Sequence, residues 1–406
     1  MPTTQANKAV LFTAFEPSGD DHAAAVIAEL RRRRPGLAIH AWGGPKMQAA
    51  GAELVARTGA DAVMGVPGLA KIREHRQINK NIAHWLAAHP EVVLHVPVDS
   101  PAANFPICKI AKTQGRRVVH LVAPQLWAWG PWRIKKLKRC TDLVLCLLPF
   151  EQEWFAARDV PARFIGHPLF DEALDHGALD QRASEMPRAK NDAPNIAILP
   201  GSRPAEIRRN FPVMLNAFNA LRERHPGAHA VVAAVTETAR EDLYARANLH
   251  GGWPKDMDVV VGETDAVIRW CDLALVVSGT VTLQIAKQAK PMVIMYKTNE
   301  LMFKLVASRV LTTEHFALPN LIAGREAIPE LVPYFKDQGQ LIEAAEKLIA
   351  SEALRNEQSQ ALREITSKFD GIEAAREAAD AIEEVAQLPA RRVIDGAPVR
   401  STTPSA

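Results

Sequence analysis

The sequence lacks a long apolar stretch. Its longest run of mostly apolar residues covers about eight positions near residues 143–150, whereas a helix that crosses a bilayer needs about 20. The first residues, MPTTQANKAVLF, also lack the apolar segment of a secretory signal peptide. We therefore expect a cytoplasmic protein that meets a membrane, if at all, from one side only.

Cysteine is scarce, and its spacing excludes the common metal and redox motifs. The four cysteines are Cys108, Cys140, Cys146 and Cys271. No two of them form a Cys-x-x-Cys pair, and none has zinc-site spacing to histidine, so we interpret all four as core thiols in a reducing compartment. The pair Asp256 and Asp258 precedes a predicted strand, whereas ligand-binding residues of parallel sheets follow strands. We interpret this pair as a solvated loop, and we predict neither a metal site nor a cofactor.

Two nucleotide-binding signatures are missing as well. Neither G-x-G-x-x-G nor G-x-x-x-x-G-K-[ST] occurs, which disfavours a dinucleotide-dependent dehydrogenase and a P-loop NTPase. The 406 residues are 48% apolar and 23% charged, which excludes a disordered or collagen-like chain. This length is typical of two domains.

Charge is unevenly distributed along the chain. The net charge is +3, but residues 1–170 contain 22 Lys and Arg against 13 Asp and Glu, a local excess of +9. The remaining residues therefore carry a net −6. A basic first half indicates an anionic partner, and nucleic acid, a phosphorylated metabolite and an anionic membrane surface all remain open at this point.

Short apolar segments alternate with amphipathic stretches along most of the chain. Continuous apolar runs of this length are typical of strands that are covered on both faces. The alternation predicts an α/β protein with two doubly wound parallel sheets and right-handed crossovers. The predicted strands are residues 9–15, 92–98, 118–122, 143–148, 196–199, 230–235, 273–277 and 292–296.

The polar segment 175–194 is predicted to be a linker between domains. It separates an N-terminal domain, residues 1–174, from a C-terminal domain, residues 195–354. Residues from about 341 onward have helical patterns that end near residue 387, and we expect helices within 355–387 to complete the first domain. The tail 388–406 has little to bury and is expected to be disordered.

Polar loops follow two predicted strands of the first half. The segment EPSGD, residues 16–20, is either a substrate or phosphate loop or an ordinary capped turn. Asp99 follows the strand 92–98 and precedes Pro101, so it is either a general base or a helix N-cap. The carboxyl ends of parallel strands share one edge of a sheet, where ligands bind.

Two further loops follow strands of the second half. The segment PGSR, residues 200–203, combines a flexible glycine, hydroxyl and backbone donors, and an arginine fork that suits a diphosphate. The segment SGT, residues 278–280, is a second loop of small residues before a helix that carries Gln284. Together they predict one pyrophosphate site.

A tryptophan-rich segment, WAWGPW at residues 127–132, precedes a cluster of cations. Its aromatic and basic residues include Trp127, Trp129, Trp132, Arg133, Lys135 and Lys136. Such a segment suits a membrane interface with anionic lipid, but stacking on single-stranded nucleic acid, or core tryptophans beside a solvated helix, would give a similar pattern.

In this order the segments resemble the lipid-A-disaccharide synthase family of bacterial glycosyltransferases, which have two Rossmann-like domains facing a cleft (the GT-B type). The resemblance extends over roughly residues 9–385. The segments that carry it are EPSGD at 16–20, GGPKMQAAG at 43–51, VMG at 63–65, APQLWAW at 123–129, CTDLVLCLLPFE at 140–151, FIGHP at 164–168, LPGSRPAEI at 199–207, SGTVTLQ at 278–284 and LPNLIAG at 318–324.

The resemblance implies an inverting transfer from UDP-diacylglucosamine to diacylglucosamine 1-phosphate at the inner membrane, with Asp99 as the base. It also implies which residues bind the substrates. The donor side would consist of Gly201, Ser202, Arg203, Ser278, Gly279, Thr280, Gln284 and Asn320. The acceptor side would consist of Glu16, Ser18, Gly19 and Asp20.

The chain departs from the family pattern at four places. Phe15 stands where the family usually has glycine, and Gln284 where it usually has glutamate. Residues 315–317 read His-Phe-Ala instead of a Tyr/Phe-Ser pattern, and the segment after Val66 is more polar than a membrane-docking patch. Gln284 can still accept a hydrogen bond through its carbonyl oxygen.

Two other functions fit part of the pattern. Nucleotide-sugar epimerases share the two-domain architecture and a similar diphosphate site, and a non-catalytic sugar-nucleotide binder would tolerate Gln284. Asp99 and the Trp-Ala-Trp segment match the transferase and argue against the epimerase. Nucleic-acid binding has only the basic first half in its favour.

Overall fold

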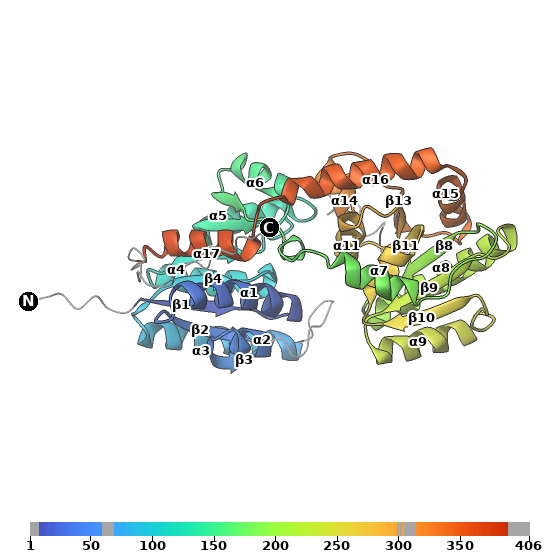
Figure 1. Cartoon of the computed structure of the whole chain (residues 1–406). Coiled ribbons are helices and arrows are strands. Elements are labelled where there is room, and N and C mark those ends of the chain that lie inside the picture. Colours follow the sequence, from blue (N-terminus) through green and yellow to red (C-terminus); the bar gives the residue numbers. More distant parts are fainter. Residues whose placement is uncertain (1–7, 59–68, 299, 301–302, 304–312, 389–406) are drawn as a thin grey trace, which may run out of the picture.

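The computed structural model describes residues 8–58, 69–298, 300, 303 and 313–388 (Figure 1). The VMG segment, the polar residues directly after Val66 and the predicted tail from residue 389 onward lie outside the described residues. Figure 1 shows two α/β halves side by side, the blue-to-cyan half built from the first part of the chain and the green-to-yellow half from the second.

The first half is a seven-stranded parallel sheet with the order β3-β2-β1-β4-β5-β6-β7. Its strands are β1 Ala9–Thr13, β2 Ala38–Gly43, β3 Glu53–Arg57, β4 Val92–Pro97, β5 Arg117–Leu121, β6 Leu143–Cys146 and β7 Ala162–Phe164. Its helices are α1 Pro17–Arg33, α2 Pro45–Ala49, α3 Leu69–Ala88, α4 Pro101–Thr113, α5 Ile134–Cys140 and α6 Pro149–Ala156.

The second half is a six-stranded parallel sheet with the order β10-β9-β8-β11-β12-β13. Its strands are β8 Asn195–Leu199, β9 His229–Ala234, β10 Met257–Val261, β11 Leu273–Val277, β12 Met292–Lys297 and β13 Glu330–Tyr334. The helices from here to the C-terminus are α7 His176–Ser184, α8 Pro204–Arg224, α9 Glu237–Asn248, α10 Thr264–Trp270, α11 Val281–Lys287, α14 Leu318–Ala323, α15 Gly339–Ala350, α16 Glu352–Thr366 and α17 Ala374–Val385.

All eight predicted strands are present, so the α/β prediction with two doubly wound sheets is confirmed. The strands that were not predicted lie at or next to the sheet edges. Edge strands are covered less completely and tolerate charged residues such as Glu53, Asp258 and Glu330, which interrupt the apolar runs. Asp258 lies within hydrogen-bond distance of His229 Nε2, 2.7 Å away, and Asp256 forms an ion pair with Arg222, 3.2 Å apart.

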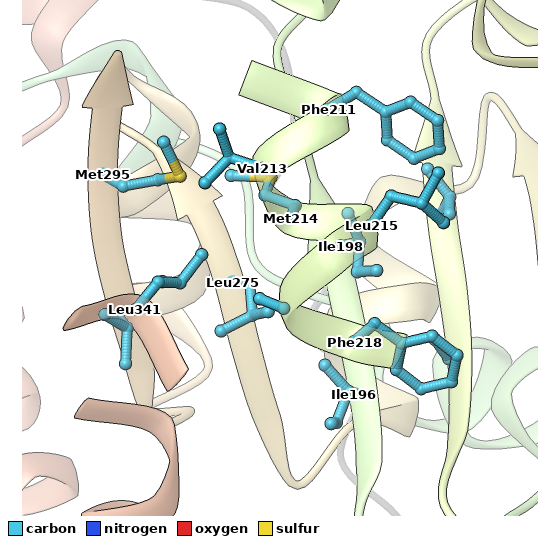
Figure 2. Packing of buried hydrophobic residues seen from close by; sticks show 14 of the residues in the cluster. Ile196, Ile198, Phe211, Val213, Met214, Leu215, Phe218, Leu275, Met295 and Leu341 are labelled. Carbon is cyan, nitrogen blue, oxygen red and sulfur yellow. The ribbon is translucent and has the colours of Figure 1, made fainter. Parts of the chain in front are cut away.

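Helix α8 shows how a sequence pattern positions a loop. Ile207, Phe211, Met214, Phe218 and Leu221 recur at helical spacing and are all buried against the second sheet (Figure 2). Helix α8 thus shares one core cluster with residues of β8, β11 and β12. Its N-terminus, directly after the PGSR loop, lies at the carboxyl edge of the sheet, where β8 ends.

The predicted linker contains the helix α7. The carboxylate of Asp175 accepts a hydrogen bond from the backbone N–H of Ala178 and caps the helix. Leu179, Ala183 and Met186 then pack against a core cluster of the second half, and α7 contacts α10. An apolar stripe on an otherwise polar segment therefore makes it helical.

The C-terminal helices divide between the two halves. We expected the helices of residues 355–387 to complete the first domain, but α16 packs on α11, α14 and α15 of the second half. Helix α17 packs on α1 and β5 of the first half, where Asp380 and Glu383 pair with Arg33 and Arg34 (Figure 1). The chain thus crosses back to the first half between α16 and α17.

Candidate active site

Neighbouring strands bring the EPSGD loop and Asp99 together. Strands β1 and β4 are parallel neighbours, with Thr13 opposite Pro97, so the loops after them share one edge of the first sheet. The hydroxyl of Ser100 donates a 2.7 Å hydrogen bond to the carboxylate of Glu16. The structure therefore places Glu16 and Asp99 in one site, as the rule for parallel strands predicts.

Asp99 and Ser100 adopt a backbone conformation that is rare for residues with a side chain. Their φ angles are +46° and +38°, in the left-handed region. The Asp99 N–H donates to the carbonyl oxygen of Leu121, and the Asn104 side-chain amide donates to the carbonyl oxygens of Val98 and Asp99, each 2.9 Å away. Such conformations persist where surrounding contacts hold them, and they are concentrated at functional sites.

A buried chain of hydrogen bonds orients Asn104. The Thr13 hydroxyl donates to the Asn104 side-chain oxygen at 2.7 Å, and His95 Nε2 lies 2.8 Å from the same hydroxyl. Because the Thr13 proton points to Asn104, His95 must donate from Nε2. Burial lowers the pKa of His95 to about 3, so the ring is neutral and its proton stays on Nε2. Asn104 was missed by sequence reasoning because a buried amide in a helix carries no motif.

The surroundings of Asp99 raise its pKa. Burial is the main cause, and the nearby carboxylate of Glu16 adds to it, whereas a hydrogen bond from the Ser100 backbone acts in the opposite direction. A carboxylate with a raised pKa is a stronger base than one in water, which suits proton abstraction from a hydroxyl group.

Of the other residues in the EPSGD segment, Asp20 serves to hold the fold. Asp20 is buried, and its two oxygens accept three 3.0 Å hydrogen bonds from the backbone N–H groups of Gly44, Lys46 and Met47. The expectation that Asp20 lines the acceptor side is therefore corrected, because its carboxylate is occupied in capping α2. Ser18 and Gly19 lie in the first turn of α1, where Gly19 is buried and Ser18 is exposed.

The two predicted diphosphate loops share the carboxyl edge of the second sheet. Strands β8 and β11 are parallel neighbours, with Leu199 opposite Val276, so residues 200–203 and 278–280 follow adjacent strand ends. Gly201 has a φ of +110°, which favours glycine. The Thr282 hydroxyl donates to the Gly279 carbonyl oxygen at 2.7 Å and stabilises the second loop.

Gln284, on the helix that follows the second loop, lines a cavity of about 410 Å³. The cavity also includes the residues that follow β10, from Gly262 to Ala266, and residues of α7. A side chain on α11 that faces the turn after β10 is well placed to contact part of a ligand bound at the same sheet edge.

Asn320 is fully buried and does not point into a binding site. Its amide donates to the Ile328 carbonyl oxygen and to the Glu330 carboxylate, and its side-chain oxygen accepts from the N–H groups of Ala327 and Ile328, all within 2.9 Å. The prediction of a direct donor contact is therefore wrong, because all of this hydrogen-bonding capacity is used in holding the segment before β13.

The tryptophan segment divides into a buried and an exposed part. Trp127 belongs to a core cluster that includes Leu199 of the second half, and its indole N–H donates to the carboxylate of Glu151 at 2.9 Å. Trp127 is therefore corrected from a membrane-facing residue to a core residue. Burial raises the pKa of Glu151, which the sequence did not single out as functional, to about 7.

The exposed part consists of Trp129, Trp132, Arg133, Lys135 and Lys136, which we call the Trp-basic patch. Trp129 and Trp132 are 45% and 63% exposed. The guanidinium of Arg133 lies 3.8 Å from the centre of the Trp129 ring, as in a cation–π contact. In the part of the chain that the structure describes, no helix is both long and apolar enough to cross a membrane.

A family model described as lipid-A-disaccharide synthetase matches residues 10–385. The chain belongs to the lipid-A-disaccharide synthase family. The lipid-A-disaccharide synthase of Myxococcus xanthus is 33% identical over 386 residues, which cover 95% of this chain and 98% of that relative. The family resemblance stated from the sequence motifs is thus confirmed, and the chain is a glycosyltransferase.

Solved structures show the fold. The calicheamicin glycosyltransferase CalG4 superposes with a TM-score of 0.59 at 17% identity, covering 94% of this chain and 99% of CalG4. The UDP-GlcNAc 2-epimerase of Neisseria meningitidis superposes with a TM-score of 0.60 at 12% identity, covering 93% of this chain and all of that one. These neighbours show that the fold is of the GT-B type, whereas the family match separates the transferase from the epimerase.

Glu16→Gln is expected to shift the acid limb of the pH–activity profile of this synthase to lower pH. The Glu16 carboxylate raises the pKa of Asp99. With Asp99 as the base that the family resemblance implies, activity requires its deprotonated form, so removing the neighbouring charge should preserve activity at lower pH. Glutamine can still accept the hydrogen bond from Ser100. An unchanged acid limb, or a shift to higher pH, in kcat/KM measured across pH would contradict this coupling.

Proposed function

We propose that this chain joins UDP-2,3-diacylglucosamine to 2,3-diacylglucosamine 1-phosphate, forming UDP and an acylated disaccharide 1-phosphate of lipid A biosynthesis. Membership of the lipid-A-disaccharide synthase family over residues 10–385 is the observation that carries this proposal. Two sheet edges, one with a carboxylate base and one with anion-binding loops, supply the parts that this reaction needs.

Asp99 is the proposed catalytic base. As the primary hydroxyl oxygen of the acceptor forms a bond to the anomeric carbon of the donor, the carboxylate takes its proton. The bond between that carbon and the β-phosphate oxygen breaks on the opposite side, and its electron pair leaves with UDP. A single displacement converts the α-linked donor into a β-linked product. Asp99 accepts a hydrogen bond from the Asn104 side chain and donates one to the Leu121 carbonyl oxygen, and these two bonds hold its backbone for this step.

The second sheet edge is proposed to hold the departing nucleotide. The exposed guanidinium of Arg203 and the backbone N–H groups at Gly201 and Ser202 neutralise charge that develops on the diphosphate. Ser278, Gly279 and Thr280 provide donors from the second loop. Gln284, on the wall of the 410 Å³ cavity, accepts a hydrogen bond from the ribose through its carbonyl oxygen.

The Trp-basic patch is proposed to dock the protein on the anionic face of the inner membrane. Both substrates carry acyl chains and reside in lipid, and the helices among the described residues cannot cross a bilayer, so the proposal has the enzyme reach its substrates from the membrane surface. Indole rings partition to the headgroup level, and cations are attracted to anionic lipid.

The double substitution W129A/W132A is expected to weaken co-sedimentation with anionic vesicles at low salt. The partition coefficient should fall at least about tenfold, since each ring that leaves water contributes on the order of 1 kcal/mol. Leu249→Ala, which removes another exposed apolar side chain from the second half, is the matched control and should bind like the wild type. Equal sedimentation of the double variant and the wild type would refute docking through this patch.

An assay of the purified protein with both lipids tests the proposed function. We expect UDP and the disaccharide lipid to appear in equal amounts only when donor and acceptor are both present. Conversion of the donor alone into an epimer would support the isomerase instead. UDP binding without UDP release in the presence of both lipids would indicate a non-catalytic binder.

A further inference from the structure

The carboxylate of Glu206 occupies the hydrogen-bond donors of the PGSR loop. Its Oε2 atom accepts from the backbone N–H groups of Ser202 and Arg203, each at 3.3 Å, and its Oε1 atom accepts from the Arg203 guanidinium at 3.1 Å. Two backbone donors and an arginine at the start of a 21-residue helix are also the groups that would bind a phosphate. An internal anion therefore already lies where the proposed site needs a ligand.

The position of the Glu206 side chain requires a glycine at residue 201. A Cβ atom at Gly201 would lie 2.7 Å from both the Cβ and Oε2 atoms of Glu206, too close for any residue other than glycine. Because glycine has no side chain, the Glu206 side chain has room beside Gly201. The φ of Gly201 is +110°, a backbone conformation that also favours glycine. Gly201, which the sequence analysis placed in a predicted diphosphate loop, thus accommodates a carboxylate of the same chain.

The hydrogen bonds between Glu206 and the backbone of the loop are weak. Its hydrogen bonds to the two N–H groups exceed the usual range of about 2.7–3.2 Å for such bonds. The Arg203 side chain is 60% exposed, so the guanidinium can turn to a ligand without leaving a buried position. A diphosphate offers more charge and more acceptor oxygens than one carboxylate, and it can compete for all three donors.

We propose that Glu206 is an internal anion that the diphosphate of the nucleotide displaces, and that it thereby sets the affinity for UDP and speeds UDP release. This inference rests on the proposed function of the PGSR loop. While the site is empty, Glu206 keeps the loop in its binding shape. When UDP is bound, the negative charge of Glu206 lies beside the diphosphate and opposes it, so the carboxylate is a positioning residue that acts through the loop.

Glu206→Gln tests this inference by calorimetry with UDP and with inorganic pyrophosphate. Glutamine keeps an acceptor for the backbone N–H groups but carries no charge, so we expect the Kd for both ligands to fall roughly tenfold. In turnover, product inhibition by UDP should strengthen, and kcat should fall more than kcat/KM. Substitution of a residue that only stabilises the fold would neither tighten binding of UDP and pyrophosphate nor strengthen product inhibition by UDP.

The control is Glu237→Gln. Glu237 lies in the first turn of α9 and pairs with Arg240 three residues later, which matches the Glu206–Arg203 spacing, but it follows β9, outside the two loops. It should leave the Kd for UDP unchanged. If E206Q does not fold, Glu206→Asp, whose shorter side chain draws the charge away from the loop, should show a smaller gain in the same measurement.

The failures of the inference and of the proposed function are distinguishable. If the wild type binds UDP and E206Q binds it equally well or more weakly, the inference alone is refuted, because Glu206 would then serve to orient Arg203. Absence of UDP binding by the wild type would refute the proposed function and the inference with it.

Discussion

Asp99→Asn is expected to lower turnover by about 10²- to 10⁴-fold, because an amide cannot take the proton of the attacking hydroxyl. The substitution preserves the size of the side chain. The bonds that fix its backbone, from Asn104 and to Leu121, involve only main-chain atoms of residue 99, so the loop should keep its shape. In the proposed function UDP binds at the edge of the other sheet, so its affinity should not change.

The measurement is kcat with both lipid substrates, beside a calorimetric titration with UDP. Asp159→Asn, an exposed carboxylate of the first half, is the control and should turn over like the wild type. Turnover of Asp99→Asn near the wild-type rate would remove Asp99 from the role of base. A loss of UDP binding in parallel with turnover would indicate a structural defect instead.

Arg203→Ala is expected to weaken UDP binding about 10- to 100-fold, the range for loss of a hydrogen-bonded charge that faces a charged ligand. The side chain is exposed, and among the described residues its ion pair is with Glu206, so its removal should cost little stability. Removing Arg203 also leaves the Glu206 charge uncompensated beside the diphosphate, which adds to the loss.

Arg224→Ala is the matched control for Arg203→Ala. Arg224 is similarly exposed, 59% against 60%, and lies at the opposite end of the same helix, α8. Its substitution should not change UDP affinity. Equal Kd values for wild type and Arg203→Ala in calorimetry would refute the assignment of the diphosphate to the PGSR loop.

The sequence predicted the central strands and the edges at which the site residues gather. Central strands of a parallel sheet are buried on both faces, so Val92–Pro97 and Leu273–Val277 appear as unbroken apolar runs. Edge strands such as Glu53–Arg57 carry charges and lack this signal. Since strand ends determine which loops meet, the central strands were sufficient to place Asp99 beside the EPSGD loop.

The sequence did not predict which polar side chains face a ligand and which hold the fold. Asp20 and Asn320 lie within family motifs, yet both are engaged by other parts of the protein. Asp20 binds backbone N–H groups about 25 residues later, and Asn320 binds backbone groups and the Glu330 carboxylate before and in β13. Trp127 and Trp129 are two residues apart, yet one is buried on Glu151 and the other is exposed. Glu206 is visible as an acidic residue in the first turn of a helix, but its contact with Gly201 depends on the loop conformation. The sequence alone does not show in which direction a side chain points in the folded protein.

The configuration of the new glycosidic bond tests the central claim most directly. If one carboxylate on the first sheet deprotonates the acceptor while UDP leaves from the second, the sugar is displaced once and its anomeric centre inverts. NMR of the disaccharide product made from the α-linked donor should therefore show a β linkage. An α linkage would require two displacements or a front-face attack, and it would contradict the account.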